Sequence, residues 1–70
     1  MASFRVLYGD GSIAKNTKVS ISVDGGGMSY GFTDDRGYVT VSTSGTYGKI
    51  IIDGRTVHQG NLNIGEIRIR

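Results

Sequence analysis

Apolar and polar residues alternate along most of this 70-residue chain. The clearest case is residues 17–23, in which Val19, Ile21 and Val23 are separated by polar residues. A period of two is typical of a strand that is buried on one face. Similar runs occupy residues 4–8, 28–32, 38–42 and 62–69, and residues 47–52 form a dense β-branched run. The pattern predicts an all-β chain of about six to seven short strands, because no run has the longer period of a helix.

Turn residues separate these runs, at positions 9–12, 24–27, 34–37 and 53–54. The strongest turn signal is Asp53-Gly54, because Asp-Gly between apolar runs favours a two-residue type I′ hairpin. In that hairpin Ile50 is expected to lie opposite Val57, on the core face. Near the end of the chain the apolar positions change parity around Gly65, which predicts a β-bulge or kink there.

The alternation also predicts which side chains form the core. The expected inward set is Phe4, Val6, Ile13, Val19, Ile21, Val23, Phe32, Val39, Val41, Tyr47, Ile50, Ile52, Val57, Leu62, Ile64, Ile67 and Ile69. The chain has no cysteine, so disulfides are excluded and this packing must supply the stability. The margin is small for a domain of this size, and a second copy covering an exposed sheet edge would help.

Length and pattern together predict one domain over residues 1–70, a small antiparallel β-sandwich. A small barrel of the OB or SH3 type is the alternative, because it would use similar short strands.

The order of the segments resembles a known family. The order is a Gly-Asp-Gly connector at 9–11, an apolar strand at 19–23, a Thr-Asp-Asp-Arg-Gly-Tyr step at 33–38, Gly-Thr-Tyr at 45–47 and Ile-Ile-Ile-Asp-Gly at 50–54. This order is similar to the carboxypeptidase-regulatory-like and transthyretin-like (prealbumin-like) β-sandwich domains. The resemblance implies an antiparallel sandwich of seven strands or fewer that has a structural or interaction role. Its motif carries no catalytic residue, so none is transferred.

The residues offer little for catalysis, metal binding or phosphate binding. A Ser-His-Asp triad would have to use His58, the single histidine, and no Gly-x-Ser-x-Gly elbow is present. The paired Asp34 and Asp35 fit a turn, and the ordered oxygen ligands of a calcium loop are missing. The glycines at 25–27 lack the Lys-Ser/Thr of a phosphate loop. We therefore expect that the chain has no catalytic activity and binds no cofactor or metal. A hydrolase that uses His58 is a remote alternative.

Candidate surface residues come from two groups. Arg5, Arg68 and Arg70 could form a basic stripe, and Tyr30, Tyr38 or Phe32 could add stacking surfaces to it. Such a surface would suit single-stranded nucleic acid, although Glu66 interrupts it, and exposed aromatic rings could also bind carbohydrate. The second group is Ile51 and His58, which share the outer face of the predicted hairpin.

The sequence thus favours a non-catalytic module that acts by contact with a protein partner, including a second copy of itself as a homodimer. Nucleic acid is the less favoured partner, because the formal net charge is only +2. No apolar stretch is long enough to span a membrane as a helix, and residues 1–5 lack the apolar core of a secretory signal. The expected location is cytoplasmic, or extracellular if the chain is a domain of a longer protein.

Overall fold

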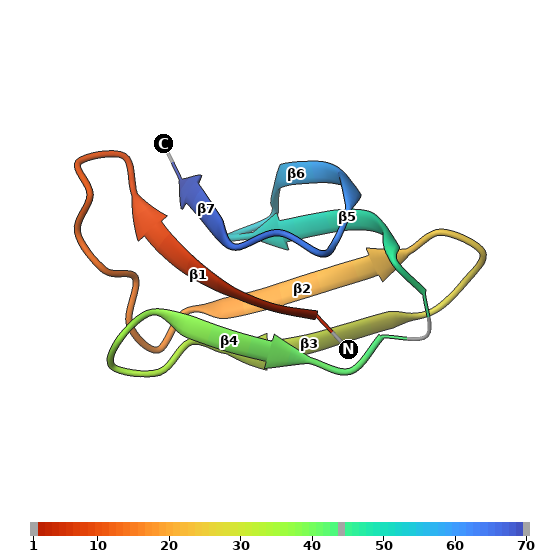
Figure 1. Ribbon diagram of the computed structural model, residues 1–70, viewed down its shortest axis with the longest axis horizontal. Helices are drawn as coiled ribbons and strands as arrows, with labels where there is room; N and C mark the ends of the chain where they lie inside the picture. Colours follow the sequence, from red (N-terminus) through yellow and green to blue (C-terminus); the bar gives the residue numbers. More distant parts are fainter. Residues whose placement is uncertain (1, 44, 70) are drawn as a thin grey trace.

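The computed structural model describes residues 2–43 and 45–69, which form strands and contain no helix. The strands are β1 (Ala2–Tyr8), β2 (Lys18–Val23), β3 (Met28–Phe32), β4 (Tyr38–Val41), β5 (Tyr47–Ile52), β6 (Arg55–Asn61) and β7 (Glu66–Ile69). They form a three-stranded sheet of order β4-β1-β7 and a four-stranded sheet of order β3-β2-β5-β6 (Figure 1). The predicted small all-β fold is confirmed. The strand pairs are antiparallel except β1 with β7, which run parallel.

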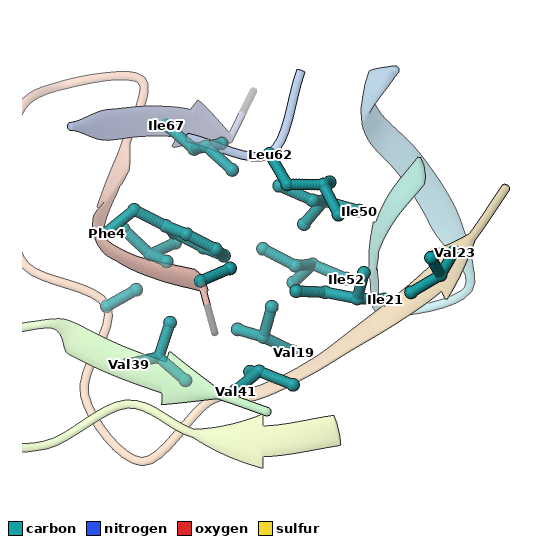
Figure 2. Close-up of a cluster of buried hydrophobic side chains, with 13 residues drawn as sticks. Phe4, Val19, Ile21, Val23, Val39, Val41, Ile50, Ile52, Leu62 and Ile67 are labelled. Atoms are coloured by element: carbon teal, nitrogen blue, oxygen red, sulfur yellow. The ribbon is translucent and has the colours of Figure 1, made fainter. Parts of the chain in front are cut away.

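The core lies between the two sheets (Figure 2). Phe4 of β1 faces Ile21 of β2 and Ile50 and Ile52 of β5, and all four are almost fully buried. The further predicted core residues that are buried are Val6, Val19, Val23, Val39, Val41, Leu62 and Ile67. Those that are half-buried are Ile13, Val57, Ile64 and Ile69. The alternation of the sequence therefore identified most of the core.

The predicted inward positions of Phe32 and Tyr47 are wrong, because these side chains are 59% and 55% exposed. In β3 the inward position is taken by Gly31. A Cβ at Gly31 would lie 3.2 Å from Val39 Cγ2 and 3.3 Å from the carbonyl oxygen of Thr40. β4 therefore packs so closely under β3 that no large side chain fits between them, and the apolar residues of β3 face outward.

The Asp53-Gly54 turn has the predicted form, with φ of 54° at Asp53 and 75° at Gly54, as a type I′ turn requires. Ile52 pairs with Arg55 and Ile51 with Thr56, but the predicted pairing of Ile50 with Val57 is wrong. Ile50 lies opposite His58 and not Val57, because the ladder shifts between Ile50 and Ile51. An extra residue on β6 therefore makes a β-bulge, which leaves Val57 and His58 both half-buried.

The parity change near the end of the chain takes a different form from the bulge expected at Gly65. Residues 62–65 lie outside any strand and connect β6 to β7, so β7 starts with a new parity. Leu62 N–H donates to the carbonyl oxygen of Thr46 at 2.7 Å, and Arg5 N–H donates to the carbonyl oxygen of Gly65 at 3.0 Å. These bonds join the connection to β1 and to the residue just before β5.

Candidate functional site

The outer face of the four-stranded sheet carries a row of apolar side chains on β3. Met28, Tyr30 and Phe32 are 67%, 65% and 59% exposed, and they occupy successive outward positions of the strand. We call these three residues the β3 stripe. A contiguous apolar patch on a small soluble protein commonly marks a contact surface.

Contacts with neighbouring side chains hold the rings of the β3 stripe in place. The rings of Tyr30 and Phe32 meet edge to face, with centroids 6.2 Å apart and planes at 86°. Lys18 of β2, which pairs with Phe32 in the ladder, places Nζ 4.7 Å from the centroid of the Tyr30 ring. Aromatic pairs and cation–π contacts of this kind each contribute roughly 0.5–1 kcal/mol. The stripe is therefore partly ordered before any partner binds, which lowers the entropy cost of binding.

A hollow of about 280 Å³ lies beside the β3 stripe. Ser20 of β2 is flanked in the ladder by Tyr30 on one side and Ile51 on the other. Because Ser20 is small, it leaves a depression beside Ile51. The residues that line it are Lys18, Ser20, Met28, Ile51, Asp53 and Gly54. The face therefore offers an apolar row next to a pocket with polar groups at its rim.

β3 is also an edge strand of its sheet. Val23 N–H donates to the carbonyl oxygen of Gly27 at 3.0 Å, and Thr33 N–H donates to that of Thr17 at 3.0 Å. Hydrogen-bonded pairs alternate with non-bonded pairs in an antiparallel ladder, so the main-chain groups of the stripe residues point away from β2. β3 has no charged residue and no proline, which are common protections of an edge.

The structure divides the predicted surface residues between the two sheets. Tyr30 and Ile51 lie on the outer face described above, and Ile51 is half-buried. Arg5, Tyr38 and Arg68 lie on the three-stranded sheet.

Arg5 and Arg68 of the predicted basic stripe each contact neighbouring residues of the same sheet or turn. The guanidinium carbon of Arg5 is 5.4 Å from the Tyr38 ring centroid, and Arg5 Nε donates to the carbonyl oxygen of Arg36 at 3.0 Å. Arg68 Nε is 3.6 Å from Glu66 Oε2. Arg70 lies outside the described residues.

His58 lies on β6, where its Nε2 is 2.7 Å from the main-chain oxygen of Asn61. A main-chain group therefore orients the ring, whereas the histidine of a catalytic triad is oriented by a carboxylate. Within residues 2–43 and 45–69, no three His, Cys, Asp or Glu side chains gather as metal ligands would.

Asp10 is a carboxyl whose pKa is held below its usual range. The Ser12 hydroxyl and the Ser12 main-chain N–H donate to Asp10 Oδ1 at 2.6 Å and 2.9 Å, and both bonds stabilise the charged form. The group is fully exposed in a tight turn after β1. Its hydrogen bonds order that turn.

Sequence reasoning named Tyr30 as a surface residue and Phe32 as both a core residue and a possible stacking surface, but it did not single out Met28. The signal was present, because all three share one parity in residues 28–32. The alternation nevertheless predicts an inward Phe32, since alternating apolar residues usually point to the core. Only the closeness of β4 to Gly31 reverses that interpretation.

Comparison of this chain with family models, curated proteins and solved structures finds no match. The likeness to carboxypeptidase-regulatory-like and transthyretin-like domains therefore stays a prediction. The part of the chain that the structure describes contains no helix long and apolar enough to cross a membrane.

Proposed function

We propose that this domain is a non-catalytic binding module that contacts a protein partner through the outer face of its four-stranded sheet. The observation that carries the proposal is the β3 stripe, three large apolar side chains in a row that are each more than half exposed. Tyrosine, phenylalanine and methionine are enriched in protein interfaces, where they fill pockets of the partner.

The area of the β3 stripe indicates what share of an interface it could supply. An aromatic side chain buries roughly 150–250 Å² when fully covered. Three side chains that are about two-thirds exposed therefore offer roughly 300–500 Å². A standard interface buries about 800 Å² on each partner. The stripe would supply the apolar centre of such an interface, and the neighbouring hollow and Ile51 would extend it.

Single-stranded nucleic acid is a second candidate partner for the same face. Lys18 projects from this face over the ring of Tyr30, and Lys49 of β5 lies on the same face, across Ser22 from Met28. Lysines interleaved with aromatic rings are typical of single-strand binders. Asp53 at the rim of the hollow counts against this partner, because it would repel phosphate.

The test compares two variants of matched type. Tyr30→Ser combined with Phe32→Thr removes most of the stripe, and Tyr8→Ser removes an exposed tyrosine, 43% exposed, from the three-stranded sheet. Both variants should keep the fold, because the replaced side chains lie outside the core. Each protein is immobilised and exposed to an extract of the source organism, and the retained proteins are identified by mass spectrometry.

The proposal predicts a partner that is retained by the wild type and by Tyr8→Ser but lost from the stripe variant. Retention of the same proteins by all three would refute it. Salt-sensitive retention of single-stranded DNA, lost on Lys18→Ala, would assign the face to nucleic acid instead.

A further inference from the structure

A second hollow, of about 270 Å³, lies at the opposite edge of the sandwich from β3. It opens between β6, the last strand of the four-stranded sheet, and β7, the last strand of the three-stranded sheet. The residues that line it are Arg55, Thr56, Val57, Arg68 and Ile69. Its place and chemistry differ from those of the β3 stripe, so it is independent of the function proposed above.

The hollow combines an apolar wall with two cationic groups. Val57 and Ile69 are half-buried and pack against the core, and the bulge of β6 places Val57 there. Arg55 comes from one sheet and Arg68 from the other. No acidic side chain is among the residues that line the hollow.

The carboxylate of Glu66, which pairs with Arg68, holds it weakly. Glu66 Oε2 lies 3.6 Å from Arg68 Nε, and the two side chains are 47% and 59% exposed. Exposed ion pairs of this length contribute little to stability. An incoming carboxylate can therefore compete with Glu66 for the guanidinium group.

We propose that this hollow binds a carboxylate on a short aliphatic stem. Guanidinium groups bind carboxylates in a planar, bidentate geometry, which gives both strength and orientation. The stem would cover Val57 and Ile69, and their burial adds an apolar contribution. The volume is just below that of pockets for drug-sized ligands, about 300–1,000 Å³, so the ligand is small. A short-chain acid and the C-terminal aliphatic residue of a peptide share this chemistry.

The experiment titrates the isotopically labelled domain with four small probes and follows main-chain amide signals by NMR. Hexanoate represents the free acid and N-acetyl-leucine the peptide terminus, whereas hexanol and N-acetyl-leucinamide are their uncharged counterparts. The proposal predicts saturable shifts at residues 55–57 and 68–69. The better-bound acid should bind at least about tenfold more tightly than its uncharged counterpart, because hydrogen bonds to charged groups are the strong ones.

Variants separate the two guanidinium groups from the general charge of the protein. Arg55→Gln and Arg68→Gln should each weaken acid binding by about tenfold. Glu66→Gln should tighten it, because the competing carboxylate is gone. Arg36→Gln, an exposed arginine in the turn before β4, is the matched control and should leave binding unchanged.

Tighter binding of hexanoate would assign the site to free acids, and tighter binding of N-acetyl-leucine would assign it to peptide termini. Equal binding of acids and uncharged counterparts would overturn the proposal. So would shifts outside the hollow, or equal loss of binding in Arg36→Gln.

Discussion

Replacement of Gly48 by alanine is predicted to destabilise the domain strongly. Gly48 is buried on β5 and lies opposite Val23 of β2. A Cβ at this position would overlap the carbonyl oxygen of Ser22 and would lie 3.0 Å from Val23 Cα. These are main-chain atoms in the central strand pair of the four-stranded sheet, so they cannot move without disturbing the ladder.

The magnitude follows from the rigidity of that contact. Overpacking typically costs about 1–3 kcal/mol, and a main-chain clash belongs at the upper end. A domain of 70 residues has a total stability of roughly 4–10 kcal/mol. A loss of about 3 kcal/mol would lower the melting temperature by roughly 12–24 °C, since each kcal/mol corresponds to about 4–8 °C in a domain of this size.

Gly65→Ala is the matched control, because a Cβ there meets nothing within 4 Å and its φ is not positive. Its stability should stay within about 0.5 kcal/mol of the wild type. Urea unfolding followed by circular dichroism measures both variants. Free energies of unfolding for Gly48→Ala and Gly65→Ala that agree within 0.5 kcal/mol would show that β2 and β5 do not approach as described.

Four further predictions test other features of the molecule. Gly54→Val should lower the free energy of unfolding by about 1–2 kcal/mol, because φ is 75° there; an unchanged melting temperature would argue against the type I′ turn. Ser12→Ala should raise the pKa of Asp10, as measured by an NMR titration. Because the pKa of Asp10 is lower in the folded state, its charged form stabilises the fold above the ordinary pKa of 3.8. The wild type should therefore have a higher free energy of unfolding than Ser12→Ala at neutral pH, and this difference should disappear as the pH falls through the folded-state pKa. Thr33→Val removes the oxygen that accepts a hydrogen bond from Thr17 N–H at 2.8 Å, and it should cost about 1 kcal/mol and speed hydrogen exchange at that amide; unchanged exchange would contradict this. If the domain pairs with itself, its melting temperature should rise with protein concentration, whereas a constant melting temperature and a sedimentation mass of 7.5 kDa would identify a monomer.

The sequence predicted those features that depend on local chemistry. The strand around Val19–Val23 follows from alternation, and the strand around Ile50–Ile52 follows from its run of β-branched residues. The inward residues of both strands are buried against the opposite sheet. The Asp53-Gly54 turn follows from the backbone freedom that its two positive φ angles require. These elements need no information about distant parts of the chain.

The features that escaped prediction depend on contacts between distant segments. Phe32 points outward because β4 lies against Gly31, and only the assembled sandwich brings β4 to that place. The bulge at Val57 is a second case, because a single added residue in β6 leaves the sequence pattern almost unchanged. The arginine-lined hollow could not be predicted for the same reason, since Arg55 and Arg68 belong to different sheets.

Photo-crosslinking from the β3 stripe tests the central claim most directly. A photoreactive phenylalanine analogue replaces Tyr30 in one protein and Tyr8, the exposed tyrosine of the other sheet, in a second. Both proteins are irradiated in cells of the source organism, and adducts are identified by mass spectrometry. The account predicts a discrete protein adduct from position 30 that excess wild-type domain suppresses, and none from position 8. Equal adducts from both positions, or none from position 30, would contradict it.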